Sequence, residues 1–284
     1  MPYELKGRNV LVTGGSAGLG AIVSTSFAQQ GCNVAINYFN RLEPAQKVQK
    51  ECEGFGVKAV VIKADMTDTA GCKKAVEETI EKLSGIDIVI ANAGWTRFSE
   101  FDNLDSMDES EWDKCWAANV KAPHALLKAA KPTFLKNEEG GVMITTGSIA
   151  AVSQAGSSMP YAVTKAAQLQ LVKCLGATQG PKIRVNTVLP GLLLTEWVCL
   201  FLPPLVSFSI FSVVRLPISF HYGQRAIQGL KYSPEMIQAV KDKAALKHET
   251  YLKDCADAFI MLAKNTSMTG MRIQVDAGLN VQGD

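Results

Sequence analysis

Short apolar runs alternate with longer amphipathic stretches along most of the chain. The apolar runs cover residues 8–14, 33–37, 58–64, 87–94, 141–148, 183–191 and 272–278. Stretches with helical spacing separate them, at 18–30, 44–55, 70–83, 108–117, 119–136, 160–178 and 254–264. Continuous Val, Ile and Ala runs are typical of strands buried on both faces, and repeated strand–helix–strand units build parallel sheets. We predict one α/β domain, a doubly wound parallel sheet of about seven strands with helices on both faces.

Composition and charge narrow the class of protein. The 284 residues are 47% hydrophobic and 20% charged, as in globular proteins, and a net charge of +2 without a basic stripe argues against nucleic acid as a partner. The seven cysteines and three histidines are scattered, which fits neither a metal site nor a disulfide framework. Reduced thiols and an N-terminus without a leader-like segment predict a cytoplasmic protein.

The first predicted strand leads into a glycine-rich stretch, TGGSAGLG, from Thr13 to Gly20. Gly14, Gly18 and Gly20 have the spacing T-G-x-x-x-G-x-G, and a predicted helix opens at once. Glycines let a backbone approach a pyrophosphate closely, and a helix N-terminus points its N–H groups at such an anion. In this strand–loop–helix context the motif predicts a dinucleotide site in a Rossmann-type sheet.

Further motifs follow in an order and spacing that resemble the short-chain dehydrogenase/reductase family, in its TGxxxGxG and YxxxK branch of NADP-dependent carbonyl reductases. These are Asp65 in KADMTD, ANAG at 91–94, Asn119 in AANV, Ser148 in TTGSIA, YAVTK at 161–165, RVNTVLPGLLLT at 184–195 and MTGMRIQVDAG at 268–278. The resemblance runs from Arg8 to about Trp197 and resumes from about Gly229 to Asn280.

Tyr161 and Lys165 are four residues apart, so they share one face of a helix. A free phenol has a pKa near 10, and a nearby ammonium lowers that pKa, so the pair can exchange a proton with a carbonyl or alcohol oxygen. The resemblance makes Tyr161 the general acid/base, Lys165 its tuning partner and Ser148 the hydroxyl that binds substrate. It also makes Asn119 a link from Lys165 to a water chain for proton relay, although by itself Asn119 also fits a polar residue that kinks a helix.

The resemblance also implies a set of cofactor-binding residues. They are Gly14, Ser16, Gly18, Leu19, Gly20, Asn37, Tyr38, Arg41, Asp65, Met66, Asn92, Ala93, Gly94, Tyr161, Lys165, Pro190, Gly191 and Thr195. Within this set, Asp65 is expected at the adenine, and Thr195 with the backbone after Pro190 at the nicotinamide carboxamide.

The residues after the second predicted strand bear on the choice of nicotinamide cofactor. A carboxylate there would bind the ribose 2′-OH of NAD, whereas an arginine accepts the 2′-phosphate of NADP. The sequence INYFNR has no carboxylate before Glu43, and Arg41 can pair with a phosphate. Ala17 argues the other way, because many NADP-using members carry Lys or Arg at that place. We expect NADP(H), with NAD(H) less favoured and Arg41 as a solvated helix-start charge in that case.

The expected reaction interconverts a carbonyl and a secondary alcohol. Candidate pocket residues are mostly apolar and suggest a hydrophobic small-molecule substrate: Trp95, Thr96, Ile149, Gln154 and Leu192 to Leu194. A homodimer or homotetramer is expected. The alternative function is a dinucleotide-binding sensor or scaffold that has lost catalysis.

One stretch, VCLFLPPLVSFSIFSVVRLPISF at 198–220, departs from the rest of the pattern, with Arg215 as its single charge. A membrane span needs roughly 20 apolar residues. The run before Arg215 is shorter, contains Pro203 and Pro204, and falls inside the domain, so we expect no span. A hydrophobic substrate lid is one interpretation, since loops tolerate long insertions.

A retained intron is the interpretation we prefer for residues 198–228. The segment opens with Val198, whose codons begin GT, and closes with Gln228, which CAG encodes. It is 31 residues long, and its removal joins PGLLLTEW to GLKYSPEMIQAVKDKAALK and leaves about 250 residues.

Sequencing the mature transcript tests this hypothesis. The expected message lacks the codons for 198–228, and the protein made from it is expected to be more soluble than the longer form. A mature message that still encodes Val198 to Gln228 would contradict it.

Overall fold

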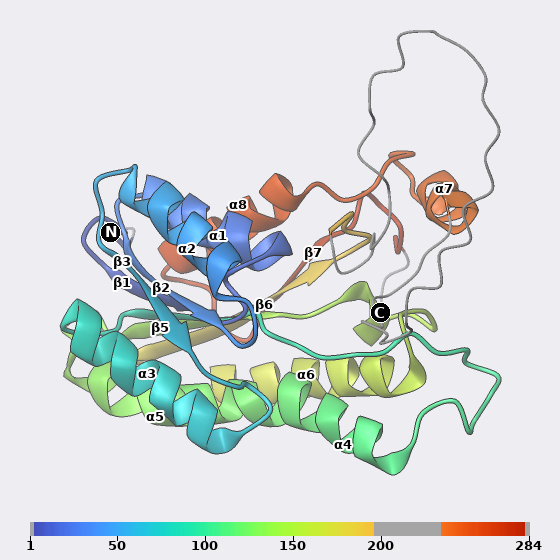
Figure 1. Cartoon of the computed structure of the whole chain (residues 1–284), viewed down its shortest axis with the longest axis horizontal. Helices are drawn as coiled ribbons and strands as arrows, with labels where there is room; N and C mark the ends of the chain where they lie inside the picture. The colour runs from blue at the N-terminus through green and yellow to red at the C-terminus, as the bar shows by residue number, and fades with distance from the viewer. Residues whose placement is uncertain (1–2, 196–233, 282–284) are drawn as a thin grey trace, which may run out of the picture.

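The predicted strands form one seven-stranded sheet in the computed structural model, which describes residues 3–195 and 234–281 (Figure 1). The strands are β1 (Asn9–Val12), β2 (Asn33–Tyr38), β3 (Ala59–Lys63), β4 (Ile88–Ala91), β5 (Gly141–Thr146), β6 (Ile183–Pro190) and β7 (Arg272–Val275). Their order is β3-β2-β1-β4-β5-β6-β7, and every neighbouring pair is parallel. The chain leaves β1 to one side and returns to the other at β4, so the crevice outside the carboxyl ends of β1 and β4 is the expected ligand site.

Helices cover both faces of this sheet (Figure 1). One face carries α1 (Gly18–Gln29), α2 (Leu42–Glu53) and α8 (Leu252–Lys264). The other carries α3 (Thr69–Leu83), α5 (Ala122–Lys136) and α6 (Met159–Thr178), with α4 (Glu109–Trp116) packed beside α6. The remaining helical elements are the π-helical turn η1 (Ala117–Lys121), the 3₁₀ turn η2 (Ile149–Ala151) and α7 (Pro234–Lys243).

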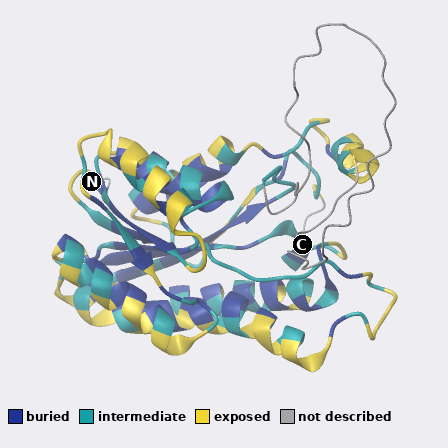
Figure 2. Cartoon of the chain, in the orientation of Figure 1, coloured by how far each residue is buried: buried dark blue, intermediate teal, exposed yellow. Residues whose placement is uncertain are grey.

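Side chains of the strands enter two buried clusters, one on each face. Val10 and Val12 belong to the cluster beneath α1 and α8, whereas Leu11, between them, belongs to the cluster beneath α3 and α5. Successive side chains of a strand point to opposite faces, so a sheet covered on both sides needs apolar residues at every position. This arrangement explains the unbroken apolar runs of the sequence, and Figure 2 shows the strands buried between exposed outer helix faces.

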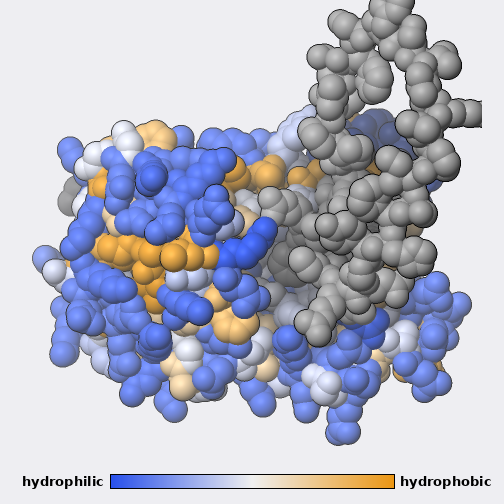
Figure 3. Space-filling model, in the orientation of Figure 1, coloured by the Kyte–Doolittle hydropathy of each residue, from blue (hydrophilic) through white to orange (hydrophobic). Residues whose placement is uncertain are grey.

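β3 is an edge strand of the sheet and, among the described strands, pairs only with β2. Figure 3 shows apolar side chains between the two helix layers at this edge, where Val60 and Val61 are half-buried. The Lys82 amine donates to the Val61 carbonyl at 3.5 Å, and the Lys58 amine donates to the Lys82 carbonyl. Lysines along an edge oppose pairing with a strand of another molecule.

Every predicted strand and helix is observed, with differences mainly at the ends, and α7 and η2 are additional elements. The stretch 87–94 is a strand only to Ala91, and 141–148 only to Thr146. The residues beyond are apolar or small, and so resemble strand, but they turn away into loops. The two helices predicted at 108–117 and 119–136 are joined through η1 rather than separated.

Residues 198–228 lie outside the described part of the chain, so the lid and intron interpretations both remain hypotheses. Within the described ranges, no helix is both long enough and apolar enough to cross a membrane.

Candidate active site

The glycine-rich loop between β1 and α1 leaves almost no room for side chains. Gly14 and Gly18 have φ of +60° and +53°, a region that favours glycine. A Cβ at Gly20 would lie 2.2 Å from the Gly14 carbonyl oxygen and 2.6 Å from Nδ2 of Asn92. Gly20 therefore lets the start of α1 pack directly against the Gly14 carbonyl and Asn92.

The N-terminus of α1 lies immediately after this loop. Ala17, at its N-cap, supplies no side-chain hydrogen bond, and the first turn contains no acidic residue. The first N–H groups of a helix have no partner within the helix and carry the positive end of its dipole. Uncapped glycine-lined N–H groups suit the pyrophosphate of a dinucleotide, for which Ser16 and Leu19 were predicted contacts. The Leu19 side chain is buried in the core, so any contact by Leu19 is through its backbone.

Thr13 connects this loop to the loop after β4. Its Oγ1 accepts hydrogen bonds from the backbone N–H groups of Asn92 at 3.0 Å and Ala93 at 2.9 Å, and donates to the Ile90 carbonyl. Asn92 Nδ2 donates to the Thr13 carbonyl at 3.0 Å, and Asn92 Oδ1 accepts from Thr146 Oγ1 at 3.0 Å. The predicted residues Asn92 and Ala93 thus hold the ends of β1, β4 and β5 together. A role for Thr13 was not predicted, although it opens the glycine motif.

Asn37, predicted to contact the cofactor, is buried beneath the same loop. Its Oδ1 accepts from the Gly14 N–H at 3.1 Å, and its Nδ2 donates to the carbonyls of Ile62 and Ala64 at 3.3 and 3.0 Å. The side chain of Asn37 therefore fixes the glycine loop against the ends of β2 and β3. Cofactor contact by Asn37 itself remains a prediction.

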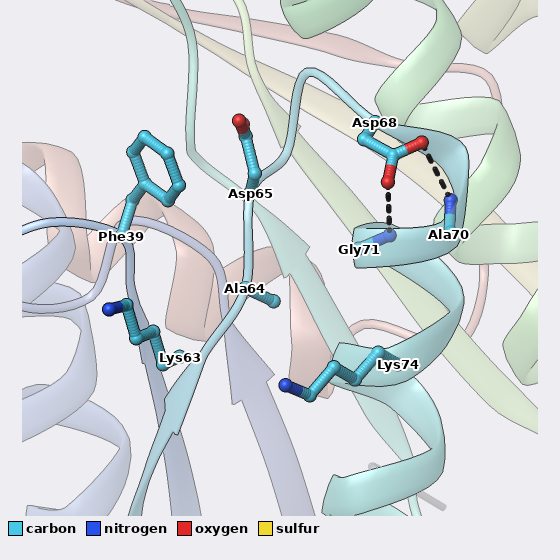
Figure 4. Close-up of a pocket in the computed structure, with 8 residues that line it drawn as sticks. All are labelled: Phe39, Lys63, Ala64, Asp65, Asp68, Ala70, Gly71 and Lys74. Atoms are coloured by element: carbon cyan, nitrogen blue, oxygen red, sulfur yellow. Dashed lines mark hydrogen bonds between the residues drawn. The ribbon is translucent and has the colours of Figure 1, made fainter.

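A hollow of about 340 Å³ opens at the carboxyl ends of β2 and β3 (Figure 4). Its lining consists of Phe39, Lys63, Ala64, Asp65, Asp68, Ala70, Gly71 and Lys74. Asp65 Oδ1 accepts from both the N–H and the hydroxyl of Thr67 at 2.8 Å, which leaves the other oxygen for a ligand, whereas Met66 is buried. Asp68 caps α3 through the N–H groups of Ala70 and Gly71. The half-exposed Phe39 ring gives this hollow a flat apolar wall suited to an aromatic base.

Tyr161 and Lys165 lie on the N-terminal part of α6. Ser158 caps this helix by accepting the Tyr161 N–H at 3.2 Å, a cap that the Ser-x-Pro start of the helix could have predicted. The Lys165 ammonium lies 5.5 Å from the centre of the Tyr161 ring and donates to the Thr146 carbonyl at 2.6 Å. Burial lowers the pKa of Lys165 to about 8, because the buried amine is poorly solvated in its charged form.

Ser148 lies two residues beyond the carbonyl that holds Lys165. Its Oγ accepts the Ala150 N–H at 3.1 Å and so caps η2. Since the hydroxyl oxygen is the acceptor in this bond, the hydroxyl hydrogen is left to donate to a substrate oxygen. Ser148 and the Thr146 carbonyl that binds Lys165 therefore lie together at the end of β5.

Asn119 occupies the π-helical turn η1 and is fully buried. Its Oδ1 accepts from the Trp95 N–H at 3.0 Å, and its Nδ2 donates to the Trp95 carbonyl and to Thr164 Oγ1, each at 3.0 Å. Asn119 therefore joins η1, the loop after β4 and α6, and it sits at a local distortion of the helix, as its alternative interpretation expected. The proton relay through Asn119 remains a prediction.

The segment after β6 returns to the glycine loop. A Cβ at Gly18 would lie 3.4 Å from Cγ2 of Thr195, so these two predicted residues are neighbours. Gly191 follows the buried Pro190, donates to the Val275 carbonyl at 2.9 Å and has no room for a Cβ beside Asp276. Predicted cofactor residues therefore lie along the carboxyl ends of the strands, from Asp65 after β3 to Thr195 after β6.

Within the described ranges, no group of three or more His, Cys, Asp or Glu side chains could hold a metal ion. Burial raises the pKa of the thiols of Cys32, Cys52, Cys72, Cys115 and Cys255 to about 11 or 12. These five thiols therefore remain protonated at neutral pH and are poor nucleophiles.

Comparisons with known proteins bear on the family and the fold of the chain. The family model for the short chain dehydrogenase matches residues 8–199. The L-rhamnose 1-dehydrogenase (NAD(P)(+)) of Sphingomonas sp. strain SKA58 is 33% identical over 193 residues, which are 68% of this chain and 75% of that protein. The 3-oxoacyl-acyl-carrier-protein reductase FabG of Staphylococcus aureus is 32% identical over 193 residues, 66% of this chain and 76% of that protein. A short chain dehydrogenase from Burkholderia cenocepacia J2315, solved in complex with NADP, has a TM-score of 0.79 and 28% identity, and the match covers 98% of this chain and 100% of that one.

The substitution Gly20→Ala tests the dinucleotide site. Its Cβ would collide with the Gly14 carbonyl, so the loop must shift, and the dissociation constant for NADPH is expected to rise about 10- to 100-fold in a calorimetric titration. Gly54→Ala is the control, because Gly54 ends α2 with an ordinary φ of −60°. Wild-type affinity in a Gly20→Ala protein with an unchanged melting temperature would contradict the assignment.

Proposed function

The chain belongs to the short chain dehydrogenase family and is an NAD(P)-dependent oxidoreductase, and we propose that Tyr161, Lys165 and Ser148 carry out its interconversion of a carbonyl and a secondary alcohol. The observation that supports these roles best is the contact between α6 and the end of β5, where the Lys165 ammonium donates to the Thr146 carbonyl beside Ser148. This contact fixes Lys165, on the helix that carries Tyr161, to a residue two positions before Ser148.

In the proposed reduction, the Tyr161 phenol donates its proton to the carbonyl oxygen of the substrate. The Ser148 hydroxyl donates a hydrogen bond to the same oxygen and stabilises the negative charge that develops there. Lys165 uses one N–H on Thr146, and its positive charge lowers the cost of leaving a phenolate on Tyr161. The bound nicotinamide supplies the hydride. In the oxidation, Tyr161 takes the proton from the alcohol.

We propose NADP(H) as the preferred cofactor over NAD(H). Between Asn37 and Leu42 there is no carboxylate to repel a 2′-phosphate, and Glu43 stands in the first turn of α2. Arg41, exposed at the N-cap of α2, can pair with that phosphate, and Tyr38 and Phe39 lead from β2 to the hollow.

We propose a hydrophobic carbonyl compound as the substrate. Apolar and half-buried side chains flank the proposed centre, among them Ile149 after Ser148 and Leu192 and Leu194 after β6. Two other predicted pocket residues have partners in the protein. The Trp95 ring lies 4.9 Å from the Lys114 amine, and Thr96 Oγ1 is 2.7 Å from Ser157 Oγ.

We further propose a cytoplasmic homodimer or homotetramer. Trp116, on α4, and Val163, on α6, are 40% and 45% exposed although large and apolar, and their helices pack together. Apolar residues on adjoining exposed helices favour contact with another copy of the chain.

Replacing Tyr161 with Phe separates an active reductase from a catalytically silent sensor. The variant lacks the proton donor, so the rate of NADPH oxidation with a panel of hydrophobic ketones is expected to fall about 10³-fold, while the protein still binds NADPH through its other contacts. Tyr251→Phe, at a half-exposed tyrosine, is the matched control and is expected to keep full activity. Undiminished carbonyl reduction by the Tyr161→Phe enzyme would show the general acid to be another group.

Replacing Arg41 with Ala tests the cofactor preference. Loss of a charge-assisted contact to the 2′-phosphate is expected to raise KM for NADPH about tenfold and to leave KM for NADH unchanged. Lys47→Ala, an exposed charge on the same helix, controls for a general loss of positive charge. Equal changes with both cofactors would argue against a 2′-phosphate contact.

A further inference from the structure

The π-helical turn η1 interrupts the regular helix between α4 and α5 at the level of the proposed centre. A π turn takes a carbonyl out of the regular hydrogen-bond ladder of the helix, and such turns are frequent at functional sites. The Asn119 carbonyl, inside this turn, accepts a hydrogen bond from Nε2 of Gln168 on α6 at 2.7 Å. One side chain of α6 therefore satisfies the distorted part of the neighbouring helix.

Gln168 is almost completely buried, with 1% of its surface exposed. Its Nε2 bonds to Asn119, but its Oε1 is buried without a hydrogen-bond partner. Leaving a buried polar atom unpaired is costly, and the fold of α6 alone would be served by an apolar residue. The one hydrogen bond of this buried amide side chain therefore reaches η1.

The same face of α6 carries the proposed catalytic residues. Gln168 stands three residues after Lys165 and seven after Tyr161, which places the three side chains along one side of the helix. Thr164, on this face, accepts from Asn119 Nδ2 and donates to the Tyr161 carbonyl at 3.0 Å. Asn119 is consequently attached to α6 at both its carbonyl and its amide group.

We propose that Gln168 is a positioning residue for the reduction: by holding the Asn119 carbonyl, it fixes α6 against η1 and so sets where Tyr161 and Lys165 lie relative to the end of β5. This inference rests on the proposed function, because the position of these two residues matters only if they act on a carbonyl. Gln168 touches neither the substrate nor the reacting atoms and acts through Asn119 and α6.

The variants Gln168→Met and Gln168→Leu remove the donor at the Asn119 carbonyl while approximating the size of glutamine. Gln170→Met, two residues along on the exposed face of α6, is the matched control. The first measurement is kcat and KM with NADPH and a reducible ketone. Both Gln168 variants are expected to lower kcat about 10- to 100-fold, the effect of a small displacement of catalytic groups, with KM for NADPH changed little.

The second measurement needs no cofactor and no substrate. It follows the titration of Lys165 by NMR of protein labelled at the lysine ε-carbon, with the signal assigned from Lys165→Arg. The titratable groups that face the Lys165 ammonium are Tyr161, on α6, and Cys115, on α4. If α6 shifts against η1, the Lys165 amine is held less closely beneath the end of β5 and is better hydrated, so both variants are expected to raise the Lys165 pKa from about 8 toward its usual value.

Several outcomes would overturn the proposal. One is a folded Gln168 variant whose kcat and Lys165 pKa both equal those of the wild type. Another is a variant whose kcat falls in step with its melting temperature while the Lys165 pKa does not change. Failure of both variants to fold would also overturn it, because the contact would then be a requirement of the fold. If the wild-type protein reduces no ketone, the proposed function fails separately, and the titration still decides whether Gln168 holds the environment of Lys165.

Discussion

The structure of the proposed centre depends on the hydrogen bonds that Thr13 and Asn92 make between three strand ends. Thr13 binds the N–H groups of Asn92 and Ala93, and Asn92 binds the Thr13 carbonyl and Thr146. Backbone hydrogen bonds between adjacent parallel strands stop where the strands end, so the loops that follow are not held by them. These few side-chain bonds extend the order of the sheet into the loops where β1 and β4 diverge.

The hydrogen bonds of Thr13 and Asn92 position two parts of the site. On one side, the glycine loop is held close to Asn92, so its backbone and the N-terminus of α1 face the crevice. On the other side, Thr146 offers its carbonyl to Lys165 and its hydroxyl to Asn92. The burial that lowers the pKa of Lys165 is a consequence of this attachment, since the amine is drawn beneath the end of β5.

Much of this architecture could be predicted from the sequence, because it rests on local patterns. Apolar runs located all seven strands, and the four-residue spacing of Tyr161 and Lys165 placed them on one helical face. Other features depend on contacts between distant residues and carry no local signal. The π turn at Asn119, the use of the Asn37 side chain beneath the glycine loop, and the bond from Gln168 to Asn119 are of this kind. Strand ends were placed too far along because small loop residues such as Ala93 resemble strand residues in composition.

A crystal structure of the protein with bound NADP+ would show whether the carboxyl ends of the strands hold both the dinucleotide and the proton donor. We expect the pyrophosphate against the backbone from Gly14 to Gly20, the adenine in the hollow beside Phe39 and Asp65, and the nicotinamide ribose within hydrogen-bonding reach of Tyr161 and Lys165. A dinucleotide bound away from the carboxyl ends of β1 and β4, or with its nicotinamide remote from Tyr161, would contradict this expectation.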